Sequence, residues 1–104
     1  MKGSRGGGET PAPFGIGLRA APNPFNPTTR LSFMLAGDGP VEIALFDLRG
    51  QRVCTLFDGE RAAGPQAVTW DGRDAAGRPL ASGVYVCRLT AGREQRVQRL
   101  ALVR

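Results

Sequence analysis

The 104-residue sequence contains no histidine, and it contains no lysine after Lys2. Histidine is the usual general base of enzymes and the most common zinc ligand, so its absence removes both roles. Hydroxyl groups such as those of Ser82 and Thr90 therefore have no partner base in the folded region that would make them nucleophiles. No pattern of carboxylates indicates a glycoside hydrolase. We expect the protein not to be an enzyme.

Cysteine is nearly as rare, with Cys54 and Cys87 as its only members, so no Cys-x-x-Cys metal or redox motif exists. In a secreted domain the two thiols could form a disulfide, whereas within a sheet they could be two small buried hydrophobic residues. Each lies inside an apolar, strand-like stretch and not beside a turn. This placement favours the second interpretation.

No run of about 18 apolar residues is present, so we predict no membrane span. The first residues contain no apolar core of the signal-peptide kind, so for an exported domain we expect the signal upstream, in a longer parent chain. The net charge is +5, but the arginines are scattered from Arg19 to Arg104 with acidic residues between them. This distribution favours a solvated basic surface over a nucleic-acid site.

Two parts of the chain differ in composition. Residues 1–13 are rich in Gly, Ser and Pro without hydrophobic periodicity, which predicts a flexible linker or arm. Residues 14–104 have the length of one domain and contain no sustained helical period. We therefore predict a single folded domain over 14–104.

Short alternating apolar stretches fill this domain and predict β-strands. We expect strands at 30–36, 41–47, 52–57, 66–70, 84–89 and 94–103, and a weak edge strand at 14–20. Gly, Asp and Pro predict turns at 47–50, 58–59 and 91–93 and a loop at 60–65. About seven short strands with this turn spacing predict an all-β fold, a small antiparallel β-sandwich with Greek-key connections.

The stretch from 70 to 85 joins two apolar runs through a loop dense in Asp and Gly. Asp side chains accept hydrogen bonds from nearby backbone N–H groups, and Gly adopts positive φ, so this loop can hold its own backbone together. Trp70 and Tyr85 flank it and are the largest anchors for a small core. We expect both in the core together with Phe33, as structural residues.

Asp71 and Asp74 in this loop, with Asp58 before it, form the one cluster that resembles a metal site. A calcium ion needs about six to eight oxygen ligands, usually with several converging carboxylates. Arg73 and Arg78 crowd the same segment, so turn capping explains the aspartates better. We predict no metal and no cofactor.

Three prolines between 22 and 27 exclude a helix there and remove backbone donors, so the chain runs extended and kinked. Phe25 stands alone among polar turn-forming residues in this segment. An isolated large aromatic in such a segment is best explained as a plug inserted into one end of the core.

Four motifs occur in order along the chain: Pro-Asn-Pro-Phe-Asn-Pro at 22–27, Phe-Asp-Leu-Arg-Gly at 46–50, Trp-Asp-Gly-Arg-Asp at 70–74 and Ser-Gly-Val-Tyr at 82–85. With them the chain, from about residue 18 to 104, resembles the C-terminal sorting domain of proteins exported by the bacterial type IX secretion system. It is equally similar to the related immunoglobulin-like domain of the flagellar hook-capping protein. The resemblance implies a small immunoglobulin-like β-sandwich.

The sorting-domain resemblance also implies a function. Such a domain is a non-catalytic module at the end of a long exported protein, and in many cases it is removed as the cargo is anchored. Its implied partners are the secretion translocon at the outer membrane and an upstream cargo domain in the same parent chain. We expect it to be monomeric, and secreted or at the cell surface after passing the periplasm and outer membrane.

Candidates for recognition are the residues that match the family's motifs or its basic, hydrophobic end. They are Pro22, Asn23, Pro24, Gly83, Tyr85, Arg99, Leu100, Leu102 and Arg104. The family usually has Lys at this end, where the present chain has Arg. The last strand has no following element to cover it, so we expect an open sheet edge with Arg96, Arg99 and Arg104 available along it.

Two other functions remain as alternatives. A structural spacer or assembly domain of the hook-capping kind would make protein–protein contacts through its sheet faces or edges. A carbohydrate-binding accessory module would usually present a row of exposed aromatic residues, whereas the single Trp and the single Tyr here are expected in the core.

Overall fold

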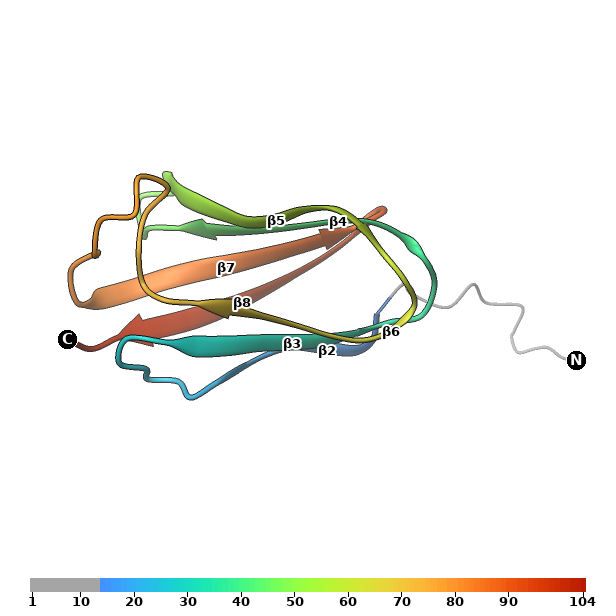
Figure 1. Cartoon of the computed structure of the whole chain (residues 1–104), viewed down its shortest axis with the longest axis horizontal. Helices are drawn as coiled ribbons and strands as arrows, with labels where there is room; N and C mark the ends of the chain where they lie inside the picture. Colours follow the sequence, from blue (N-terminus) through green and yellow to red (C-terminus); the bar gives the residue numbers. More distant parts are fainter. Residues whose placement is uncertain (1–13) are drawn as a thin grey trace, which may run out of the picture.

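The computed structural model describes residues 14–104 (Figure 1), so the arm predicted at 1–13 lies outside the described residues. Seven antiparallel strands make up this range: β2 (Phe14–Ala21), β3 (Thr29–Leu35), β4 (Gly39–Phe46), β5 (Arg52–Arg61), β6 (Gly64–Trp70), β7 (Gly83–Ala91) and β8 (Glu94–Leu102). They form two sheets, one in the order β2-β3-β6 and the other in the order β5-β4-β7-β8. The predicted all-β sandwich is confirmed.

The order of pairing gives the Greek-key connection. β4 and β5 form a hairpin in the four-stranded sheet, while β3 and β6, which flank them in sequence, pair in the other sheet. β7 then returns to pair with β4, and β8 follows it at the sheet edge. Within the described range, no helix has the length and hydrophobicity required to cross a membrane.

Alternation along the strands fills the space between the sheets. In β3 the buried apolar residues are Leu31, Phe33 and Leu35, as the pattern predicts, and in β4 Ile43 and Leu45 are fully buried. β4 pairs with β5 on one side and with β7 on the other, so it is a central strand of its sheet.

Strand β5 is longer than the sequence predicts, and the expected turn at 58–59 is wrong. Asp58 pairs with Glu42, and Gly59 pairs with Val41. The loop expected at 60–65 shortens to 62–63, because β5 and β6 extend into it from both sides. Pairing with a long neighbouring strand outweighs the weak strand propensity of Asp and Gly, and the Phe57 ring lies against Gly59.

The two cysteines flank the same central strand. Cys54 of β5 and Cys87 of β7 both pair with Leu45 of β4, from opposite sides. Two strand spacings place their Cα atoms about 10 Å apart, beyond the roughly 7 Å that a disulfide can span. Both are free and buried, and burial raises the pKa of both thiols, that of Cys87 to about 12. The interpretation as small buried hydrophobic residues is confirmed.

The two ends of the sandwich carry different connections (Figure 1). We call one the loop end, which gathers residues 22–28, 47–51, 71–82 and 103–104. We call the other the hairpin end, which holds the short connections 36–38, 62–63 and 92–93. Every long connection among the described residues is therefore at the end where the chain terminates.

Candidate functional site

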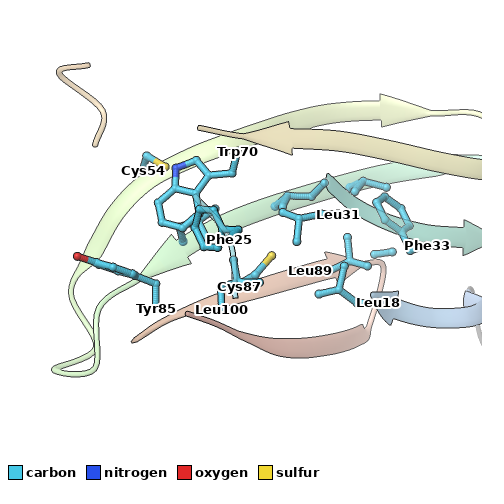
Figure 2. Close-up of a cluster of buried hydrophobic side chains, with 14 of the residues drawn as sticks. Leu18, Phe25, Leu31, Phe33, Cys54, Trp70, Tyr85, Cys87, Leu89 and Leu100 are labelled. Atoms are coloured by element: carbon cyan, nitrogen blue, oxygen red, sulfur yellow. The ribbon is translucent and has the colours of Figure 1, made fainter. Parts of the chain in front are cut away.

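Three aromatic side chains close the core at the loop end (Figure 2). The Trp70 ring centroid lies 5.5 Å from that of Phe25 and 5.6 Å from that of Tyr85, with the Tyr85 ring edge-on. The exposed fractions of Phe25, Trp70 and Tyr85 are 2%, 1% and 8%, and Phe33 lies deeper in the same core at 4%. Contacts of this geometry add to the hydrophobic stabilisation from burial.

Both polar aromatic groups donate a hydrogen bond to the loop that joins β6 and β7. The indole Nε1–H of Trp70 donates to the Arg73 carbonyl at 3.0 Å, and the Tyr85 hydroxyl donates to the Ala81 carbonyl at 2.7 Å. The second bond resembles the tyrosine corner of immunoglobulin-like folds, in which a Tyr hydroxyl bonds a few residues upstream. These side chains thus fix the loop to the core.

The proline-rich segment covers part of the last strand, and the expectation of an open edge there is wrong for residues 99–103. The Asn23 amide donates to the Arg99 carbonyl at 2.8 Å and accepts from the Ala101 N–H at 3.0 Å. The Phe25 N–H donates to the Ala101 carbonyl, and its carbonyl accepts from the Val103 N–H, both at 2.9 Å. The Asn23 side chain and the Phe25 backbone therefore pair with the end of β8 as an added strand would.

The sequence did not indicate the buried residue that holds the proline-rich segment on the core. Thr29 is fully buried, and its hydroxyl donates to the Pro22 carbonyl at 2.7 Å. A buried hydroxyl group requires a hydrogen-bond partner, and a backbone carbonyl outside the strand pairing requires a donor from elsewhere. The alternation of β3 would have predicted an inward-facing position for Thr29, had the strand been extended by one residue.

The C-terminal residue is also tied down. The Arg104 N–H donates to the Ser82 hydroxyl at 2.8 Å, and its guanidinium donates to the Leu80 carbonyl at 2.6 Å and the Gly72 carbonyl at 2.8 Å. The expectation that Arg104 is available along an edge is therefore wrong. Its five donors suit two carbonyls at once, which an ammonium would match less well.

Gly72 allows this approach. Its φ is +74°, and a Cβ at this position would lie 3.0 Å from the Arg104 Nη2 atom and 3.2 Å from the Pro27 carbonyl oxygen. The 71–82 loop, the proline-rich segment and the C-terminus thus meet at a residue without a side chain.

Asp74 caps a turn at the loop end, as predicted, whereas Asp71 instead forms an ion pair with Arg73 at 3.6 Å and Asp58 lies within β5. Asp74 accepts from the N–H groups of Ala76 and Arg78 at 2.9 Å each. Asp47 in the β4–β5 turn accepts in the same way from residues two and four ahead, and both turns end in a Gly with φ above +80°. Among the described residues, no group of three acidic or sulfur side chains could hold a metal ion.

The remaining candidates fall into two groups. Leu100 and Leu102 are buried and support the site from inside, whereas Gly83, which pairs with Leu102, is exposed. Pro22 and Pro24 are exposed. Arg99 is exposed as well, and its side chain has no ion pair or hydrogen bond within the described range, whereas Arg96 pairs with Glu94 at 3.0 Å.

The geometry that results defines a small immunoglobulin-like domain with no catalytic constellation among its described residues. Residues 21–95 match the family model of the FlgD Ig-like domain, and the chain belongs to this family. The match ends at residue 95, before most of β8, so the covered residues 99–103 lie outside it. No curated protein matches the chain.

Solved structures show the same fold in two settings. FlgD from P. aeruginosa shares 25% identity over 71% of this chain and 57% of its own, with a TM-score of 0.56. FlgD from Xanthomonas campestris, described for its role in hook capping during flagellar assembly, shares 26% over 81% and 60%, with a TM-score of 0.58.

Two further solved structures come from Porphyromonas gingivalis. PorU has a TM-score of 0.71 and 17% identity over 93% of this chain and 10% of its own. PorZ, a surface component of the type IX secretion system of the same organism, has a TM-score of 0.60 and 24% identity over 85% and 12%. The present chain thus spans about a tenth of these two proteins, and the likeness concerns the fold.

Proposed function

We propose that this domain is a non-catalytic sorting and anchoring module at the C-terminus of a larger exported protein. It directs that protein through the type IX secretion system to the cell surface, acting as a monomer. Its partners are the outer-membrane translocon and a cargo domain upstream in the same chain. The occurrence of the same fold in PorZ supports this setting.

One observation carries the proposal: residues that match the family motifs at opposite ends of the sequence converge at the loop end. Asn23 bonds to Arg99 and Ala101 across separations of 76 and 78 residues. A translocon that reads a folded protein needs a surface that exists only after folding. The joined segments 22–25 and 99–103 supply such a surface, with Arg99 projecting from it.

A reporter fusion tests the proposal. Residues 18–104 are attached to a periplasmic reporter in a cell with a working type IX system, and surface exposure is measured by protease accessibility. The proposal expects reporter at the surface, and periplasmic reporter when the translocon is deleted. If an authentic sorting domain delivers the same reporter while this fusion stays in the periplasm, the sorting function is wrong.

The second candidate is a structural or assembly domain, favoured by the family match and by the two FlgD structures. It requires no translocon, so it predicts that the fusion stays periplasmic and instead binds another component of its parent assembly. A carbohydrate-binding module is disfavoured, because Trp70 and Tyr85 are buried and offer no aromatic platform.

A further inference from the structure

The outer face of the three-stranded sheet carries a groove that begins beside the proline-rich segment, because Arg30 at its basic end pairs with Ala21. It has a volume of about 580 Å³ and is lined chiefly by Arg19, Arg30, Ser32, Met34, Pro65 and Ala67. In β3, the outward positions 30, 32 and 34 alternate with buried leucines and Phe33. The groove therefore follows the central strand, from a basic end at Arg30 to an apolar end at Met34.

The basic end of the groove is not neutralised. Arg19 and Arg30 are both exposed, and neither has an ion pair or hydrogen bond from its side chain within the described range. Arg19 pairs with Ser32, and Arg30 pairs with Ala21, so the two arginines are diagonal neighbours on one face. Diagonal neighbours lie about 7–8 Å apart, close enough for two guanidinium groups to hold one carboxylate.

On the opposite sheet, by contrast, two outward-facing arginines are paired within the protein. There Glu42 lies 3.3 Å from Arg52 and 3.5 Å from Arg88, and both guanidinium groups stack over the Phe46 ring. No acidic residue lines the groove on the three-stranded sheet. The uncompensated pair is therefore complementary to an anion from outside.

The apolar end of the groove indicates which class of anionic ligand it can bind. Met34 and Pro65 pair across β3 and β6, with Ala67 next to them, and the one amide at this end, that of Gln66, already donates to the Ala62 carbonyl at 2.7 Å. A second copy of the chain is a poor occupant because it carries a net charge of +5. An extended polypeptide presents residues four apart on one side at about 13 Å, which matches the distance from Arg30 to Met34 along β3.

We propose that this groove binds an extended acidic polypeptide segment. An Asp or Glu of that segment is held by Arg19 and Arg30, and an apolar residue four positions away packs on Met34 and Pro65. The inference goes beyond the sorting function, since the groove runs along β3 from Arg30 toward Met34 and does not include the joined segments 22–25 and 99–103.

Fluorescence anisotropy with the 104-residue chain tests it. The probe is a labelled peptide Ser-Glu-Thr-Ser-Thr-Leu-Ser, compared with versions in which Glu becomes Gln or Leu becomes Ser. The double variant Arg19→Glu/Arg30→Glu should weaken binding at least about tenfold. The matched double variant Arg49→Glu/Arg93→Glu has the same net charge and should stay within about twofold. Circular dichroism confirms that both fold.

The probes themselves separate the classes of ligand. The peptide with Gln in place of Glu should bind the unmodified protein as weakly as the original peptide binds Arg19→Glu/Arg30→Glu. In the Met34→Ala variant, the original peptide should no longer bind more tightly than the version with Ser in place of Leu. No binding of the Glu–Leu peptide, equal loss in both double variants, or equal binding of the Gln peptide would overturn the proposal. Tighter binding of polyphosphate or of phosphatidylglycerol vesicles would assign the groove to phosphate instead.

Discussion

At the loop end of the sandwich, hydrogen bonds that span 22 to 78 residues of sequence join residues 99–104 to the proline-rich segment and to the 71–82 loop. At the hairpin end, neighbouring strands are joined by short connections, and one side-chain bond from Ala63 to Asp38, across 25 residues, ties two of them together. Short turns need only set strand register. The long segments instead build a surface that no single stretch of sequence contains, so the loop end is where recognition can depend on folding.

The largest effect expected is on the aromatic group beneath the loop end. Trp70→Ala removes a ring that contacts Phe25 and Tyr85 and leaves a cavity, so unfolding should become easier by about 3–5 kcal/mol. Val97→Ala, at a side chain 66% exposed, should change stability by less than about 0.5 kcal/mol. Chemical denaturation measures both. A loss below about 1 kcal/mol for Trp70→Ala would show that the loop end does not depend on its core.

Substituting one glycine at each end allows the packing of the two ends to be compared directly. Gly72 and Gly92 have φ of +74° and +61°, but only Gly72 has atoms within 4 Å of an added Cβ. Gly92→Ala should cost about 1 kcal/mol for backbone strain alone. Gly72→Ala should cost about 2–3 kcal/mol, because Arg104 and the Pro27 carbonyl must also move. Equal losses from thermal or urea unfolding would mean that the three segments are not packed as described.

A smaller effect should follow from the amide that joins the proline-rich segment to β8. Asn23→Ala removes two hydrogen bonds at an exposed site and should cost about 1–2 kcal/mol. Asn26→Ala is the matched control, since the Asn26 side chain has no such bond, and should cost less than about 0.5 kcal/mol. Hydrogen exchange of the Ala101 amide should accelerate in the first variant only. Unchanged exchange there would contradict the added-strand arrangement.

Burial of a thiol in the core between the two ends should make the stability of the protein depend on pH. The pKa of the Cys87 thiol rises from 9.0 to about 12 because burial disfavours the thiolate. The unfolded chain loses this proton above about pH 9 while the folded chain keeps it, so stability falls as pH rises from about 9 to about 12. Between pH 8 and pH 10 the loss should be roughly 1 kcal/mol. Cys87→Val should reduce this decline and leave the part due to Cys54, whose thiol pKa burial also raises, and an unchanged decline would place the titration elsewhere.

Much of the fold follows from local pattern. Alternation at Leu31, Phe33 and Leu35 predicts an inward face, and Asp47 and Asp74 predict turns, because both signals depend on neighbours in sequence. The ends of β5 and β6 could not be predicted, since Asp58 and Gly59 are poor strand residues that become strand only through pairing with β4.

The sequence suggests candidate recognition residues, which remain a prediction, but it does not indicate their arrangement. The motif residues at 22–25 and 99–104 could be recognised in the sequence, yet nothing local indicates that Asn23 bonds to β8. The same holds for Arg104, whose guanidinium meets loop carbonyls brought near by Gly72. Contacts across more than 20 residues depend on the assembled sandwich, which is why an edge expected to be open is covered.

The central claim is that the loop end, and not the hairpin end, is read during export. Arg99 and Arg93 are both exposed arginines, one at each end, and neither side chain is held by another residue in the described range. The most direct measurement is surface delivery of the reporter fusion carrying Arg99→Glu or Arg93→Glu, with folding checked by protease resistance. The account predicts that Arg99→Glu leaves folded reporter in the periplasm, while Arg93→Glu delivers it normally. Equal delivery of the two variants, or loss with Arg93→Glu alone, would contradict it.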